Sequence, residues 1–166
     1  ACPGRNYPFD NITNGVIYDT TMPAANTLPN INGKKEIVRA GQIHAHNFAD
    51  NSLVTDGIRG VNTIKAGIKV LQTAMNLDYK AGLTVDGIFG TNSKKALGYH
   101  YVRRGETQYM VTAVQILLML KGYNCQLENP GIFGSNLEAA VKQYQRDYQL
   151  TVDGVVGHNT WMSLIH

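Results

Sequence analysis

The pentapeptide LTVDG occurs twice in this chain, at Leu83–Gly87 and again at Leu150–Gly154. Each copy continues into a second glycine and a polar pair, as DGIFGTNS at Asp86–Ser93 and DGVVGHNT at Asp153–Thr160. The first glycine permits a turn at positive φ, the apolar pair can enter a core, and the Asn-Thr or Asn-Ser pair can cap a following helix. Each copy therefore predicts a tight turn followed by the start of a helix.

Two weaker relatives of this pattern precede the copies, DGIRGVNT at Asp56–Thr63 and PGIFGSNL at Pro130–Leu137. Between the turns, apolar residues recur at helical spacing, which favours amphipathic helices. The clearest stripes are Ile64, Ile68, Leu71 and Met75, then Met110, Val114, Leu117 and Leu118, and then Leu137, Val141, Tyr144 and Tyr148. Four turn-then-helix starts in one short chain indicate internal repetition.

The order of helices and turns divides the chain into two similar halves. We predict an all-α protein with two tandem three-helix bundles, at residues 36–98 and 102–166, packed together or linked at Gly98–Arg104. Residues 1–35 contain four of the five prolines and show no helical or strand periodicity, which is typical of a tail plus a linker.

The composition excludes several classes of protein. Hydrophobic residues make up 43% of the chain and charged residues 16%, which is enough apolar material for a core. The net charge of +3 comes from scattered basic residues, so we expect no nucleic-acid partner. No apolar run approaches the ~18 residues of a membrane span, so we expect no membrane insertion.

Residues 36–166 resemble tandem peptidoglycan-binding domains of the three-helix type, which occur on bacterial and phage cell-wall hydrolases. The second half carries the closer motifs, VxxxQxLLxxxGY at Val111–Tyr123, AVKQYQ at Ala140–Gln145 and LTVDGVVGHNTWMSL at Leu150–Leu164. The first half departs from the pattern, with His44 and His46 in its opening helix where leucines are usual, and with Lys94 where the last helix normally has tryptophan.

The first ten residues, ACPGRNYPFD, are similar to the C-terminal end of zinc N-acetylmuramoyl-L-alanine amidase domains. In that family the cysteine is a zinc ligand, completed by two histidines far upstream. The resemblance implies that Cys2 binds zinc only in an intact parent domain, and that this chain is the C-terminal part of an autolysin or phage endolysin. We expect no cofactor in the fragment and zinc in the parent.

The resemblance implies a non-catalytic module that holds an amidase on peptidoglycan or another cell-wall polymer. Such a module would act outside the cell at the wall, or as a phage product on the host wall. We name five candidate ligand contacts, for which packing inside a helical bundle is the alternative role: Tyr123, Gln145, Arg103, Asn159 and Trp161.

An alternative hypothesis is an independent metal-dependent wall hydrolase that uses His44 and His46 with His100 or His158. Histidines two residues apart point to different faces of a helix, so they would share a metal only in an extended segment. The aspartates at the turns stand where Asp is common for structural reasons. Cys2 and Cys125 form no metal or redox spacing, and we expect two free thiols.

Overall fold

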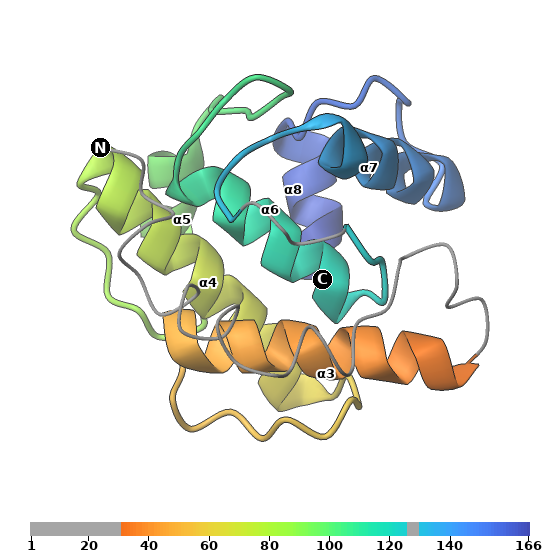
Figure 1. Ribbon diagram of the computed structural model, residues 1–166. Helices are drawn as coiled ribbons and strands as arrows, with labels where there is room; N and C mark the ends of the chain where they lie inside the picture. The colour runs from red at the N-terminus through yellow and green to blue at the C-terminus, as the bar shows by residue number, and fades with distance from the viewer. Residues whose placement is uncertain (1–30, 126–129) are drawn as a thin grey trace.

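The computed structural model describes residues 31–125 and 130–166, and this part of the chain is helical (Figure 1). The prediction of an all-α fold is confirmed. The helices, in chain order, are α3 (Ile31–Phe48), α4 (Val61–Tyr79), α5 (Thr91–Leu97), α6 (Tyr109–Leu120), α7 (Ser135–Asp147) and α8 (His158–Ile165). Helix α3 begins five residues before the predicted start at Glu36, so residues 31–35 belong to a helix and not to the linker.

Four of these helices start directly after the second glycine of a turn. Gly60, Gly90, Gly134 and Gly157 are the N-cap residues of α4, α5, α7 and α8, and none of these helices has a side-chain cap hydrogen bond. The predicted Asn-Thr cap is therefore wrong. The Asn and Thr residues lie inside the first turn of the helix, where the hydroxyl group serves a different partner.

That partner is a buried glutamine from the preceding helix. In α4, Gln72 Nε2 donates to Asp86 Oδ1 at 3.0 Å, to the Ile88 carbonyl at 2.9 Å and to Ser93 Oγ at 3.2 Å. Gln72 Oε1 accepts the Gly87 N–H at 3.0 Å. Because one amide bonds to polar groups of the turn and of the next helix, it fixes the two together.

The same arrangement recurs along the chain. Gln42 in α3 holds the turn that leads into α4, and Gln145 in α7 holds the turn that leads into α8, through the same types of partner. Gln115 in α6 accepts the Gly131 N–H at 2.9 Å, which ties Gln115 to the turn between α6 and α7. We call these four residues the turn glutamines.

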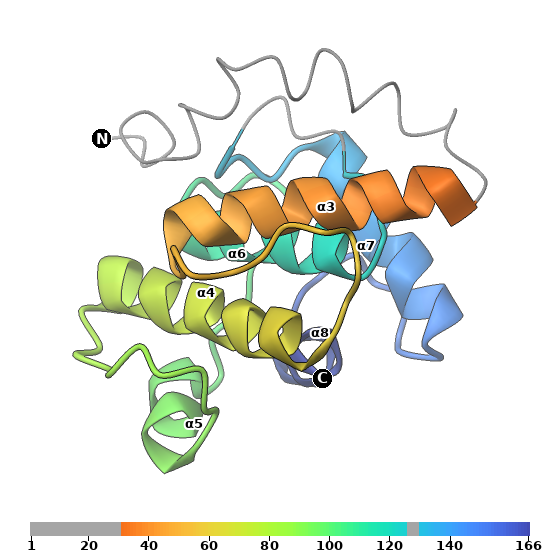
Figure 2. The same cartoon turned by 90° about the horizontal axis from the view of Figure 1, so that it is seen from below.

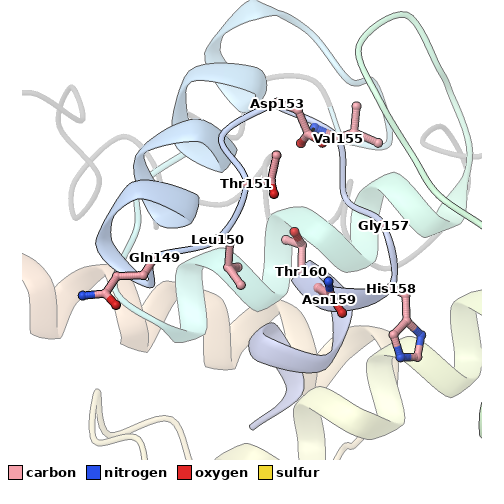
Figure 3. Close-up of a pocket in the computed structure, with 9 residues that line it drawn as sticks. All are labelled: Gln149, Leu150, Thr151, Asp153, Val155, Gly157, His158, Asn159 and Thr160. Atoms are coloured by element: carbon pink, nitrogen blue, oxygen red, sulfur yellow. Dashed lines mark hydrogen bonds between the residues drawn. The ribbon is translucent and has the colours of Figure 1, made fainter.

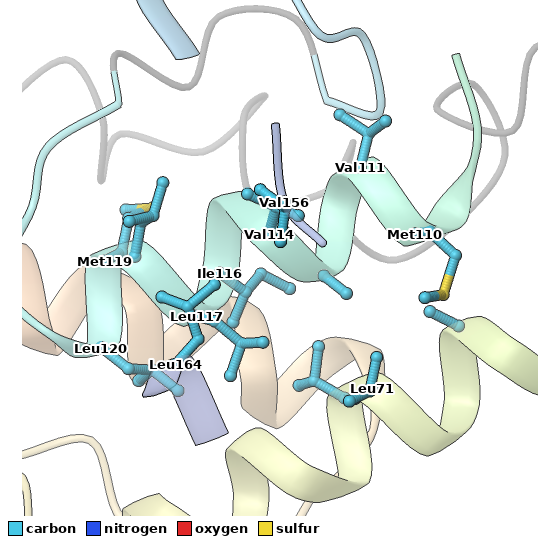
Figure 4. Close-up of a cluster of buried hydrophobic side chains, with 14 of the residues drawn as sticks. Leu71, Met110, Val111, Val114, Ile116, Leu117, Met119, Leu120, Val156 and Leu164 are labelled. Atoms are coloured by element: carbon cyan, nitrogen blue, oxygen red, sulfur yellow. The ribbon is translucent and has the colours of Figure 1, made fainter. Parts of the chain in front are cut away.

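Helix α6 is the centre of the molecule. Every residue from Met110 to Leu120 is buried, which is typical of a helix that is covered on all sides. It packs against α3, α4, α7 and α8, and Figure 4 shows Leu71 of α4 and Leu164 of α8 among the buried side chains next to it. One continuous cluster of buried hydrophobic residues therefore joins the two halves.

The connection between the halves is fixed to the second half. Val102 is fully buried and pairs with Val156, with the Val156 N–H donating to the Val102 carbonyl at 2.9 Å.

Asp78, near the end of α4, accepts the N–H groups of Tyr109 and Met110 at 3.1 and 2.6 Å. The first half thus supplies the cap for the first helix of the second half.

The last helices of the two halves differ in their surroundings. Helix α8 carries Trp161, which is fully buried, and packs against α4 and α6. Helix α5 carries the exposed Lys94 at the equivalent position, packs against α4 and lies at one edge of the molecule (Figure 2). The substitution of lysine for tryptophan therefore accompanies a helix that stands away from the core.

Candidate functional site

The turn between α7 and α8 lines a pocket of about 390 Å³ that is open to solvent. Its lining residues are Gln149, Leu150, Thr151, Asp153, Val155, Gly157, His158, Asn159 and Thr160. Figure 3 shows Leu150 and Thr151 on one side and the first turn of α8 on the other, while Gln149 and His158 point away from the centre. We call this the α7–α8 pocket.

Gln145 lies behind the pocket and connects its two walls by hydrogen bonds. Its Nε2 donates to Asp153 Oδ1 at 3.0 Å and to Thr160 Oγ1 at 3.3 Å, which holds the two walls at a fixed separation. The Leu150 N–H donates to the Gln145 carbonyl at 2.8 Å, directly after Gln149, whose φ of 58° lies in the left-handed region. The sharp reversal at Gln149 brings the chain back across the end of α7.

The chemistry of the pocket combines an apolar floor with a polar rim. Leu150 is half-buried and packs against the hydrophobic core, and Val155, another lining residue, is also half-buried. Thr151, Asp153 and Asn159 are exposed at the rim. A hydroxyl, a carboxylate and an amide around an apolar floor suit a ligand that carries both methyl groups and amides.

The turn between α3 and α4 forms an equivalent pocket of about 290 Å³. It is lined by Leu53, Val54, Asp56, Ile58, Gly60, Val61, Asn62 and Thr63, and each of these has a counterpart at the same place in the α7–α8 pocket. Two differences change its chemistry, since Val54 stands in place of Thr151 and Val61 in place of His158. The first-half pocket is therefore less polar.

A third pocket, of about 560 Å³, lies at the turn between α4 and α5. Its walls include Leu83, Thr84 and Asn92, which match Leu150, Thr151 and Asn159 in the repeat. Tyr79 and His100 also line it, with stacked rings whose centroids are 3.8 Å apart. Burial, together with the charge of a neighbouring carboxylate, raises the pKa of Tyr79 to about 12.

The structure brings only one of the five candidate contacts into the α7–α8 pocket, namely Asn159. Arg103 is exposed elsewhere, with its guanidinium carbon 5.7 Å from the Tyr101 ring centroid. Gln145 is 1% exposed and Trp161 is fully buried, so both lie in the interior in this conformation. Ligand contact by any of these residues stays a prediction.

Tyr123 lies in an aromatic cluster at the end of α7. Its hydroxyl donates to Asp147 Oδ2 at 2.6 Å, and its ring meets Tyr144 edge-on with centroids 5.3 Å apart. Burial and the hydrogen bond to Asp147 raise the pKa of Tyr123 well above its ordinary value. The phenol therefore stays protonated at physiological pH.

Sequence reasoning missed Leu150 and Thr151 as lining residues because it treated LTVDG as a turn alone. The signal that could have found them is the repeat itself. A leucine followed by a β-branched residue, valine or threonine, precedes three of the four turns, and in the structure each of these pairs lines a pocket.

The part of the chain that the structure describes contains no group of three His, Cys, Asp or Glu side chains placed to hold a metal ion. His44 and His46 lie in the helical segment α3, which turns their side chains to different faces. Cys125 is a free, buried thiol whose pKa is raised to about 12 by burial. Cys2 and the amidase-like segment around it lie outside the described residues.

In a comparison with known proteins, part of the second half of the chain matches a protein family. Residues 107–164 match the model of the family described as "Putative peptidoglycan binding domain". The chain is also similar to a peptidoglycan-binding protein from Clostridioides difficile, solved in complex with glutamine hydroxamate. That similarity has 38% identity and a TM-score of 0.37, and it covers 40% of this chain and 40% of that chain.

The family match covers α6, α7, α8 and the whole α7–α8 pocket. It confirms the predicted resemblance for residues 107–164, and it supports peptidoglycan as the partner and the cell wall as the place of action. The tandem arrangement and the amidase parent stay predictions. Among the described residues, no helix is long and apolar enough to span a membrane.

Proposed function

We propose that the α7–α8 pocket is a non-catalytic docking site for peptidoglycan. The observation that carries the proposal is the coincidence of two findings at one place. The segment matched by the peptidoglycan-binding family contains a turn that builds a pocket with an apolar floor and an amide-bearing rim. Peptidoglycan presents methyl groups next to amides, both in its alanyl peptides and in its acetamido sugars.

In this proposal, Leu150 and Val155 receive a methyl group of the ligand, and Asn159 pairs with the adjacent amide. The Asn159 side chain both donates and accepts hydrogen bonds, which matches an amide group. Helix α8 begins without a side-chain cap, so N–H groups of its first turn are available to a ligand carbonyl. A shallow site of this kind binds weakly.

The first-half pocket offers a second, weaker subsite of the same kind. It keeps the leucine and asparagine counterparts, Leu53 and Asn62, but has valines where the α7–α8 pocket has Thr151 and His158. Two weak subsites in one chain gain through effective concentration on a repeating polymer. We further propose that this arrangement holds an N-acetylmuramoyl-L-alanine amidase at the wall, as the amidase-like segment at Cys2 implies.

Co-sedimentation with Gram-positive sacculi tests the proposal. The 166-residue chain is mixed with sacculi before and after removal of secondary wall polymers, and wall turbidity is followed in the same tubes. We expect retention on stripped sacculi without clearing. Loss of retention after stripping would move the ligand to a secondary polymer, and clearing of the suspension would show catalysis.

A further inference from the structure

Three tyrosines and two cations meet at the C-terminal end of α7. Tyr144 and Tyr148 stack with ring centroids 4.2 Å apart, and Tyr123 meets Tyr144 edge-on. Lys121 Nζ lies 5.1 Å from the Tyr148 ring centroid. Arg59, from the turn between α3 and α4, is close enough to act electrostatically on Lys121 and on both stacked tyrosines. We call this group the tyrosine–cation cluster.

The two cations of the cluster have no carboxylate partner among the described residues. The ion pairs in that part of the chain involve other basic side chains, Lys69, Arg104 and Lys142. Asp147 lies at the cluster, but its hydrogen bonds come from uncharged donors, the Tyr123 hydroxyl and the Gln143 amide. No described residue therefore forms an ion pair with either cation of the cluster.

Two features show that the cations of the cluster are partly removed from water. Burial, with a further contribution from the charge of Arg59, lowers the pKa of Lys121 to about 8. Arg59 Nε is buried without a hydrogen-bond partner, although a buried donor normally has one. The Lys34 side chain lies against Gly122, next to Lys121, and brings a third basic residue to this side of the molecule.

The cluster is accessible from solvent. Tyr148 is 43% exposed, and Lys121, Tyr123 and Arg59 are half-buried. Both views place the N-terminal end of α3, which carries Lys34, on the same side as the C-terminal end of α7 (Figures 1 and 2). A ligand that approaches this side meets basic groups and an aromatic edge together.

We infer that the tyrosine–cation cluster binds an oxyanion-bearing saccharide, with Lys121 and Arg59 on the carboxylate or phosphate and the exposed part of Tyr148 against the sugar. An oxyanion supplies the missing partner of Arg59 and offsets the repulsion between the two cations. The cluster shares no lining residue with the α7–α8 pocket, so this site is additional to the proposed docking site and does not depend on it.

The test is a nuclear magnetic resonance titration of the 166-residue chain with three small ligands. N-acetylmuramic acid carries a carboxylate, N-acetylglucosamine is the matched neutral sugar, and glycerol 3-phosphate carries a phosphate without a sugar ring. We expect saturable shifts at Lys121 and Tyr148 with the acid and none with the neutral sugar. Equal shifts with both sugars would overturn the inference.

The phosphate arm identifies the source of the oxyanion. Tighter binding of glycerol 3-phosphate than of N-acetylmuramic acid would contradict the contribution of Tyr148 to a sugar and indicate a phosphate-containing wall polymer. Weaker binding supports a carboxylated saccharide.

Variants distinguish binding at the tyrosine–cation cluster from non-specific attraction of the ligand to surface charge. Lys121→Met and Arg59→Gln should each weaken binding of N-acetylmuramic acid by about fivefold or more, as expected for the loss of a partly buried charge contact. Lys94→Met, on the exposed face of α5, removes the same charge elsewhere and should leave binding unchanged. Equal effects of all three would contradict a specific site. Thermal unfolding of each variant shows whether it is folded.

A second readout does not depend on substitution. Oxyanion binding favours protonated Lys121, so its pKa should rise when N-acetylmuramic acid binds and stay constant with N-acetylglucosamine. Affinity for the acid should accordingly fall as the pH rises through about 8. Among the described residues, Arg59, Lys34, Asp147 and the three tyrosines are the other titratable groups around Lys121, and burial raises the pKa of Tyr123 and of Tyr144, so that both keep their protons in this range. A flat pH profile would contradict the inference.

Discussion

Each turn glutamine holds several buried polar groups with a single side chain. Gln145 satisfies the Gly154 N–H, the Val155 carbonyl and the Thr160 hydroxyl, among others. Removing one partner from buried groups costs the desolvation of each group left unpaired. Each turn glutamine therefore contributes more to the free energy of unfolding than a side chain that makes a single hydrogen bond.

We expect Gln145→Ala to lower the free energy of unfolding by about 2–4 kcal/mol, because it leaves several buried groups without partners. The matched control is Gln143→Ala on the same helix. Gln143 is exposed and bonds only to side chains at the surface, so its removal should change stability by less than about 0.5 kcal/mol. Urea denaturation followed by circular dichroism measures both, and equal effects would contradict the role of the turn glutamines.

His44 is a second residue whose environment sets a measurable property. It is fully buried in α3, and burial lowers its pKa well below the ordinary value of 6.5. The folded chain therefore keeps His44 neutral at pH values where the unfolded chain binds a proton. Since the unfolded state then binds more protons, stability must fall as the pH drops below about 6.5.

We expect His44→Leu to remove much of this acid sensitivity. The wild-type chain should lose at most about 1.4 kcal/mol per pH unit from this one group as the pH falls from 6.5 to 5. Thermal unfolding at pH 7.5 and pH 5 measures the difference for the wild type, for His44→Leu and for the control His158→Gln, whose imidazole is exposed. An unchanged pH dependence in His44→Leu would exclude His44 as its source.

At the scale of elements, the cap of α6 comes from another helix. Gln108, the N-cap residue of α6, has no side-chain cap hydrogen bond. Asp78 of α4 instead accepts the first two N–H groups of α6 across the junction between the halves. This replaces a local cap by a tertiary contact that ties α4 to α6.

We expect Asp78→Ala to destabilise the fold by about 1–2 kcal/mol through the loss of this cap. Asp78→Asn keeps one acceptor oxygen and should lie between Asp78→Ala and the wild type. Chemical denaturation of the three proteins gives the order. If Asn were as harmful as Ala, the loss of charge and not the cap would explain the effect.

The sequence was sufficient to predict the helices because their apolar stripes and the glycines of the turns are local signals. It was not sufficient for the caps or the pocket. The polar residues after Gly157 could have capped α8, and only the position of Gln145 shows that Thr160 is engaged by this side chain instead. Helix α6 was predicted with one apolar stripe, yet its opposite face is also buried because both halves cover it.

At the scale of the whole molecule, the two halves share one hydrophobic core. Helix α6 belongs to the second half by sequence, but it packs extensively against α3 and α4 of the first half (Figure 4). Separating the halves would expose the apolar face of α6 to water, at about 25 cal/mol per Å² of apolar surface.

We therefore expect residues 31–100 and 101–166, produced as separate chains, to be much less stable than the intact chain. Mixing the two fragments should restore helical circular dichroism and a cooperative thermal transition. Two fragments that each unfold cooperatively at the temperature of the intact chain would show that the halves fold independently.

The measurement that tests the central claim most directly is retention on stripped sacculi by variants that fill one pocket. Thr151→Arg places a long side chain in the α7–α8 pocket from an exposed position, and Val54→Arg does the same in the first-half pocket. We predict that Thr151→Arg abolishes most of the retention while Val54→Arg reduces it only partly, with thermal unfolding of both unchanged. Full retention by folded Thr151→Arg would contradict the α7–α8 pocket as the peptidoglycan site.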